Sequence, residues 1–246
     1  MIPENTRDWQ SVKRIAGDCR EWSRAFVVMG SLVLMPGEKT AKSDVDVLVL
    51  VDSLAPSLKH IPGLSEAARK DAYSLLKHHE IDAVSTKKIC YGTLVSFSVF
   101  DVRTFMRIAE LALGEISYYR TTSNQKRIEI RSFDGSSLMS ELLPVQSGTG
   151  YIVSEPCVVL ANSRTYLGIF PDAILSLVHV CYDDGSFSTF YDRIWSAVAA
   201  VASEAMGSRD IEVLVKGLIA TKINRERFSQ EVVVHIRKRL AEVMNT

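Results

Sequence analysis

The sequence predicts an α+β fold in which a small mixed sheet is followed by a mainly helical C-terminal subdomain. Short β-branched runs such as "AFVVM" and "VDVLVLV" are interspersed with helix-forming segments over roughly the first 110 residues. A polar, turn-rich stretch follows, and segments with helical periodicity close the chain. The separation of strands from helices along the chain is typical of the α+β class. The domains that we expect are 1–112, the sheet-forming core, and 113–246, a β/loop connection with the helical subdomain.

The first part contains segments typical of helix, strand, strand, helix, hairpin and helix, in this order: 10–24, 25–29, 45–51, 65–80, 81–102 and 103–113. The continuous β-branched run over 45–51 is typical of a strand that is covered on both faces. Ser65 stands at the N-cap position of the helix that follows. Within the hairpin, the glycine of "CYGT" favours a tight turn.

The segments of the second part that predict long helices are 188–206, 210–222 and 227–244. Gly207 is a suitable end for the first of these helices, and Asp210 is a suitable N-cap for the second. These signals predict the helical C-terminal subdomain.

The composition is that of an ordinary globular protein, with 47% hydrophobic and 24% charged residues. The 29 basic and 29 acidic residues cancel, so no overall field attracts the chain to nucleic acid or to an anionic membrane. The cysteines are scattered, without a C-x-x-C pair, as is typical of a reducing compartment. The N-terminal residues contain no apolar signal core, and no apolar run has membrane-spanning length. We therefore expect a cytoplasmic protein without a membrane partner.

Two carboxylates stand at the start of the strand predicted over 45–51. Asp44 and Asp46 project to the same side, because alternate side chains of a strand share a face. Two ionised carboxylates at this separation repel each other, and a divalent cation removes the repulsion. Oxygen ligands of this kind suit Mg²⁺ or Mn²⁺. The pair is therefore a candidate metal site.

A glycine and a serine precede the acid pair, at the end of the preceding strand. Gly30 allows a close approach of the backbone, while Ser31 and the amides beyond it can donate hydrogen bonds to phosphate oxygens. A phosphate-binding turn beside a metal-binding acid pair is suited to phosphoryl or nucleotidyl transfer by a two-metal mechanism.

The succession Gly30-Ser31, a loop, and Ser43-Asp44-Val45-Asp46-Val47 at the head of an apolar strand resembles the nucleotidyltransferase superfamily. That superfamily includes DNA polymerase β, poly(A) polymerases, CCA-adding enzymes and aminoglycoside nucleotidyltransferases. The resemblance implies that residues 1–112 form a nucleotidyltransferase core. It implies that Gly30, Ser31 and Ser43 bind the nucleotide and that Asp44 and Asp46 are catalytic and hold Mg²⁺ or Mn²⁺. The implied reaction moves a nucleoside monophosphate from an NTP such as ATP to a hydroxyl of an RNA, a protein or a small molecule, and releases pyrophosphate.

The family adds a third carboxylate from a neighbouring strand, as a metal ligand or as the general base that deprotonates the acceptor hydroxyl, and two acids of this chain are candidates for it. Asp82 in "EIDAV" has the apolar-acid-apolar pattern of the small stand-alone members, and Asp101 in "VFDVR" repeats that pattern. Alignment of the hairpin with polymerase β puts the position near "VSFSV", where Ser96 replaces an acid. The alternatives are a solvated strand edge for Asp82 and a helix N-cap for Asp101. A site without a third acid would still bind a nucleotide but transfer poorly, so a nucleotide-binding regulatory module with degenerate transfer chemistry stays open as the alternative function.

Two groups of basic residues are candidates for contact with a triphosphate or an RNA backbone. They are Arg120, Lys126, Arg127 and Arg131, beside Tyr118 and Tyr119, and Lys222, Arg225, Arg227, Arg237, Lys238 and Arg239. The alternative is a solvated charged surface, because acidic residues are interspersed with both groups.

Overall fold

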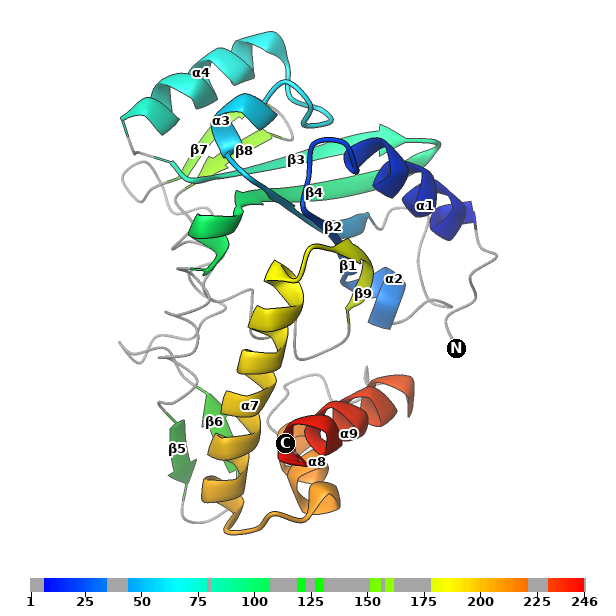
Figure 1. Ribbon diagram of the computed structural model, residues 1–246, viewed down its shortest axis with the longest axis vertical. Helices are drawn as coiled ribbons and strands as arrows, with labels where there is room; N and C mark the ends of the chain where they lie inside the picture. Colours follow the sequence, from blue (N-terminus) through cyan, green and yellow to red (C-terminus); the bar gives the residue numbers. More distant parts are fainter. Residues whose placement is uncertain are drawn as a thin grey trace.

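The computed structural model describes residues 7–34, 44–78, 81–106, 119–122, 127–130, 151–155, 158–161, 178–220 and 230–245 (Figure 1). The strands are β1 Ala25–Met29, β2 Val45–Val51, β3 Ala83–Cys90, β4 Thr93–Asp101, β5 Tyr119–Thr122, β6 Arg127–Ile130, β7 Tyr151–Glu155, β8 Val158–Ala161 and β9 His179–Asp183. The helices are α1 Arg7–Cys19, α2 Ser31–Leu34, α3 Leu54–Ser57, α4 Glu66–Lys77, α7 Ser186–Met206, α8 Ile211–Ala220 and α9 Gln230–Met244. The expected α+β class with a helical C-terminal part is confirmed.

The main sheet has seven strands in the order β7-β8-β3-β4-β2-β1-β9. It is mixed, because β2 and β4 run parallel while β1 and β2, and likewise β3 and β4, run antiparallel. Strands β7, β8 and β9 come from beyond residue 112, so the sheet extends past the expected boundary of the core. Strand β8 pairs with β3 and strand β9 with β1, where each satisfies a sheet edge that would otherwise expose unpaired backbone groups.

Helices cover both faces of the central strands. On one face, Val47 and Val49 pack in a core with residues of α1 and α4, such as Val12 and Ala68. On the other face, Leu48, Leu50 and Phe100 pack with Phe187, Phe190 and Trp195 of α7. Figure 1 shows α7 running from the sheet toward α8 and α9, which lie at the far end of the molecule. Strand β2 is therefore covered on both sides, as its composition predicts.

Local signals for turns and caps are also confirmed. The Ser65 hydroxyl accepts a hydrogen bond of 3.0 Å from the backbone amide three residues further on. Tyr91 and Gly92 form the hairpin turn with φ values of 50° and 80°, and Gly207, with φ of 59°, ends α7. Asp210 accepts a hydrogen bond of 2.8 Å from the amide of the second residue after it, at the start of α8. Each of these positions works through the residue type that made it recognisable in the sequence.

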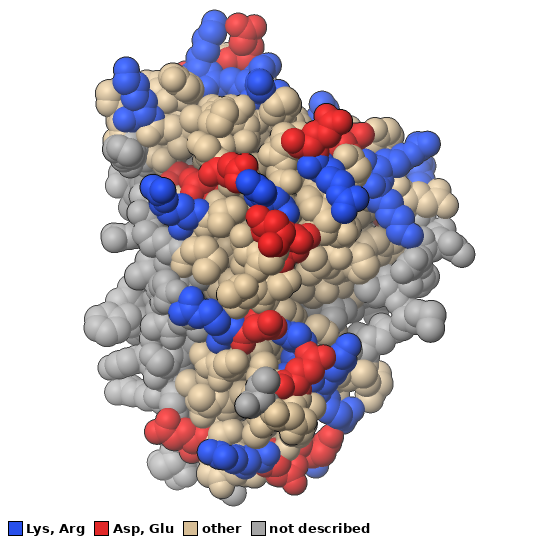
Figure 2. Space-filling model, in the orientation of Figure 1, with Lys and Arg blue, Asp and Glu red and all other residues tan. Residues whose placement is uncertain are grey.

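Charges of opposite sign lie side by side on the described surface. On the face seen in Figure 2, Lys and Arg alternate with Asp and Glu over both the sheet and the helical part. On α9, Arg237 binds Glu212 at 3.0 Å and Lys238 lies 3.7 Å from Glu242. The α9 residues of the second basic group are thus neutralised by neighbours. Within the described ranges, no helix combines the length and the apolar composition that crossing a bilayer requires.

Candidate functional site

The predicted turn and the acid pair meet at one end of the sheet. Strand β1 ends at Met29, which pairs with Asp46 at the start of β2. Gly30 follows with φ of +72°, and α2 begins at the next residue. A Cβ atom on Gly30 would lie 2.3 Å from Asp46 Oδ2, so any other residue would have to displace this carboxylate and would also be strained at this φ. The turn and the second acid of the pair are therefore in direct contact.

Asp44 precedes β2, and its side chain is 24% exposed. Its Oδ2 atom is shielded from solvent and accepts no hydrogen bond of regular geometry from the described residues. The Lys87 ammonium forms an ion pair with this same oxygen at 2.6 Å. A carboxylate oxygen that is buried in this way requires a cation beside it, because an unpaired buried charge is costly.

Ser96 and Lys87 complete a row across three strands that begins at Asp46. Asp46 pairs with Ser96 in the parallel register of β2 and β4, and Ser96 pairs with Lys87 in the antiparallel hairpin. Paired residues project to the same face of a sheet. Ser96 therefore stands on the neighbouring strand beside Asp46, where a third acid was expected, and Lys87 stands one strand further on.

The register does not bring either alternative third acid to this site. Asp101 pairs with Val51, and Asp82 immediately precedes β3, whose first pair joins Ala83 to Phe100. From Asp46 to Val51 the strand advances about 17 Å, so both acids lie at the opposite end of β2. Because β4 runs parallel to β2, an acid at the end of β4 lies beside the end of β2. The expectation of Asp82 or Asp101 as a metal ligand or base beside Asp44 and Asp46 is therefore corrected.

Asp101 has a structural role instead. Its carboxylate accepts hydrogen bonds from the Thr104 amide at 2.7 Å and from the Thr104 hydroxyl at 3.0 Å. These bonds cap the helical turn that begins after β4. The N-cap alternative for Asp101 is thus correct.

Two further predicted nucleotide contacts stay predictions. Ser31 is the first residue of α2, whose first turn closes with a hydrogen bond of 3.1 Å from the Val33 amide to the Gly30 carbonyl. The side chain of Ser31 and the whole of Ser43 lie outside the described residues, as do the basic residues Lys126, Arg131, Lys222, Arg225 and Arg227.

Lys87 is the site residue that the sequence interpretation missed. It lies in a polar stretch of an alternating strand, where lysine is unremarkable. The hairpin turn at Tyr91 and Gly92 contains the signal, because counting back from it along both strands pairs residue 87 with residue 96. The turn does not reveal that β4 lies beside β2, and this adjacency is what brings Lys87 to the acid pair.

The described residues fit a divalent cation that is shared with a substrate. They contain no group of three or more His, Cys, Asp or Glu that could hold a metal ion by themselves. Asp44 offers a buried oxygen that already holds a cationic group, and the Gly30 backbone lies directly against the Asp46 carboxylate because it carries no Cβ. Mg²⁺ commonly takes one or two carboxylates and completes its shell with water and substrate phosphates. The pair suits that mode of binding.

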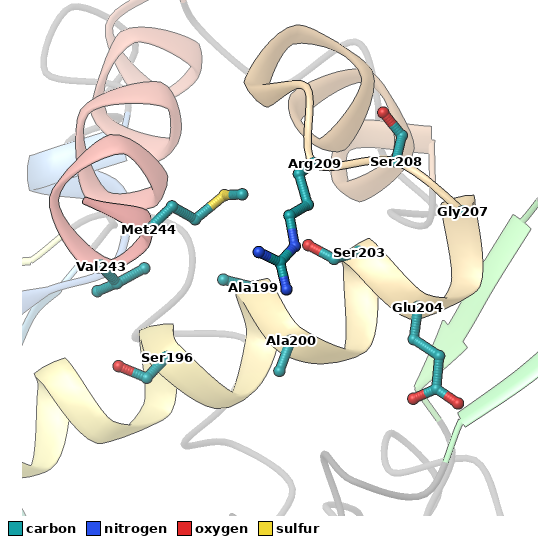
Figure 3. A pocket seen from close by; sticks show the side chains of 10 residues that line it. All are labelled: Ser196, Ala199, Ala200, Ser203, Glu204, Gly207, Ser208, Arg209, Val243 and Met244. Atoms are coloured by element: carbon teal, nitrogen blue, oxygen red, sulfur yellow. The ribbon is translucent and has the colours of Figure 1, made fainter. Parts of the chain in front are cut away.

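A separate hollow lies in the helical part, along the C-terminal half of α7. It has a volume of about 660 Å³ and is lined mainly by small side chains, with Arg209 reaching over Ser203 (Figure 3). The sheet contacts of α7 begin at Phe187, whereas the hollow begins at Ser196 and extends beyond the end of the helix. It shares no residue with the acid pair and is not part of the candidate site.

No protein family model, curated protein or solved structure was found to match this chain. The resemblance to nucleotidyltransferases therefore depends on the motif and on the geometry at the start of β2.

Proposed function

We propose that this chain is a metal-dependent nucleotidyltransferase that moves a nucleoside monophosphate from an NTP to a hydroxyl of an RNA, protein or small-molecule acceptor. The observation that supports it best is the contact between the Gly30 turn and Asp46, with Asp44 held by Lys87, which lies in the same row across the sheet as Asp46. A random acidic strand start does not require a glycine with left-handed backbone packed against its carboxylate.

In this proposal each residue has a defined part. Asp44 and Asp46 hold Mg²⁺ or Mn²⁺, which neutralises charge on the triphosphate when it is bound. The Gly30 turn allows the backbone to approach the phosphates. The acceptor oxygen attacks the α-phosphorus, the bond to the bridging oxygen breaks, and pyrophosphate leaves. Since the described part of the chain places no third carboxylate beside the pair, the acceptor proton passes to solvent or to a phosphate oxygen.

A nucleotide-binding regulatory module is the second candidate, and one observation favours it. Ser96 occupies the position beside Asp46 from which a third acid would complete a second metal site. Two carboxylates are enough for one metal that is shared with a triphosphate. A chain of this kind binds the nucleotide and transfers it poorly.

Thermal unfolding with each NTP, with and without Mg²⁺ or Mn²⁺, tests the shared part of both candidates. A ligand that binds only the folded chain raises its melting temperature. We expect metal-dependent stabilisation in the wild type and in Asp82→Asn, the matched control at the other end of β2, and none in Asp46→Asn. Transfer of label from an α-labelled NTP then separates the enzyme from the module. Absence of stabilisation by any NTP with metal would contradict both.

A further inference from the structure

Lys87 reaches the acid pair from two strands away. Neighbouring strands lie about 4.8 Å apart, so the backbones of β3 and β2 are separated by about 10 Å, with β4 between them. The lysine side chain crosses β4 on the face that carries Ser96 and brings its ammonium within 2.6 Å of Asp44 Oδ2. The small side chain at position 96 leaves room for this crossing.

The ion pair between Lys87 and Asp44 is partly open to solvent. The Lys87 side chain is 50% exposed and the Asp44 side chain 24% exposed, although Oδ2 itself is shielded. A half-exposed lysine can leave its partner without being transferred into the protein interior, because its head can be solvated in other rotamers. A divalent cation, which carries a higher charge than the ammonium, can therefore displace Lys87 from Asp44.

We infer that Lys87 is a positioning residue that competes with the divalent metal for Asp44, an inference that rests on the proposed function. When the metal enters together with a triphosphate, the Lys87 ammonium turns from Asp44 to the triphosphate. Before binding, its ammonium supplies the positive charge that the buried Asp44 oxygen requires. A metal that arrives alone must displace this ammonium and leave it without that carboxylate. A metal that arrives with a triphosphate replaces the ammonium on Asp44 and offers it new anionic oxygens.

The consequence is that metal binding depends on the nucleotide. Lys87 weakens the binding of free metal and strengthens the binding of the metal–nucleotide complex, so its removal changes the two affinities in opposite directions. A lysine with a merely structural role would not produce this opposition.

Lys88 provides a matched control. It is the next residue of the same strand, also exposed, and its side chain projects to the opposite face, where its Cβ would lie 3.2 Å from a Cβ on Gly63. Lys87→Met and Lys88→Met thus remove the same charge from the two faces of one strand. Lys87→Arg retains a cation and checks that the effect comes from the charge.

The experiment is a titration of the folded wild type and variants with Mn²⁺ alone, followed by Mn²⁺ in the presence of a non-hydrolysable ATP analogue, with bound Mn²⁺ measured by electron paramagnetic resonance. We expect Lys87→Met to bind free Mn²⁺ at least about fivefold more tightly and the Mn²⁺–analogue complex at least about tenfold more weakly. Lys88→Met and Lys87→Arg should resemble the wild type.

Two outcomes separate the inference from the proposed function. If Asp44→Asn abolishes Mn²⁺ binding while Lys87→Met binds free Mn²⁺ no more tightly than the wild type, the competition is wrong and the metal site stands. If Mn²⁺ binds neither the wild type nor Lys87→Met, or if Asp44→Asn leaves its binding unchanged, the metal site and the proposed function are both wrong.

Discussion

The two ends of the parallel pair β2 and β4 carry the same sequence pattern and have different roles. At the start of β2, Asp46 packs against Gly30 and stands beside Ser96. At the end of β4, Asp101 stands beside Val51 and caps the following helical turn. An acid next to an apolar strand is therefore no sign of a site by itself. The backbone around it and the strand direction decide whether it binds a ligand or a helix terminus.

The largest expected difference between the two ends is in nucleotide binding. Asp44→Asn and Asp46→Asn should each abolish metal-dependent binding of an NTP and reduce any transfer to background, because each removes a ligand of the metal. Asp101→Asn should leave binding unchanged, since asparagine is also a good N-cap. Calorimetric titration with the metal–nucleotide complex measures all three. If Asp44→Asn and Asp46→Asn both bound the metal–nucleotide complex as tightly as the wild type, the start of β2 would not differ from the end of β4 in ligand binding.

Gly30→Ala tests the contact that sets the start of β2 apart. The added Cβ would lie 2.3 Å from Asp46 Oδ2 in a backbone conformation with φ of +72°. We expect a loss of unfolding free energy of about 2–4 kcal/mol, together with weaker Mn²⁺ binding. Gly207→Ala is the control, because its φ is also positive, at +59°, and nothing lies within 4 Å of the added Cβ. It should cost about 1–2 kcal/mol and leave Mn²⁺ binding unchanged. Equal losses from the two substitutions would show that the contact with Asp46 is unimportant.

Ser96→Asp should sharpen the contrast by giving the start of β2 a third carboxylate. The new acid would stand beside Asp46 and opposite Lys87, so we expect it to raise Mn²⁺ affinity by about tenfold. Ser98→Asp, on the same strand and face but paired with Leu48, is the matched control. Titration with Mn²⁺ measures the affinity of both variants. A greater gain in Mn²⁺ affinity from Ser98→Asp than from Ser96→Asp would place the metal elsewhere.

Much of the fold follows from local signals, and the site does so only in part. The N-cap at Ser65, the hairpin turn at Gly92 and the end of α7 at Gly207 are decided by neighbouring residues, so the sequence predicts them correctly. The strands at the sheet edges and the parallel pairing of β2 with β4 are decided by tertiary packing. Local patterns carry no information on that pairing. This is why the acids at 82 and 101 were candidates and Lys87 was not.

The smallest expected effect concerns a polar cluster in the helical part, which shares no residue with the candidate site. His235 Nε2 lies 2.7 Å from the Tyr191 hydroxyl. Burial, assisted by Arg239, lowers the pKa of His235 from 6.5 to about 4. Between these values the unfolded chain binds the proton and the folded chain does not, so stability falls as the pH drops from 6.5 toward 4.

Substitution of His235 tests this difference between the two regions. His235→Gln should flatten the decline of the melting temperature between pH 6.5 and pH 4 by a few degrees and leave Mn²⁺ binding unchanged. An unchanged slope in His235→Gln would show that other groups determine the pH dependence.

The most direct test of the acid pair is a crystal structure of the chain with Mn²⁺ and a non-hydrolysable NTP analogue, with the metal located by its anomalous scattering. We predict a Mn²⁺ ion bound by Asp44 and Asp46, triphosphate oxygens in its remaining positions, and the Lys87 ammonium moved from Asp44 Oδ2 to a phosphate. A Mn²⁺ ion bound at Asp82 or Asp101, or an analogue bound away from Gly30 and Asp46, would contradict the account.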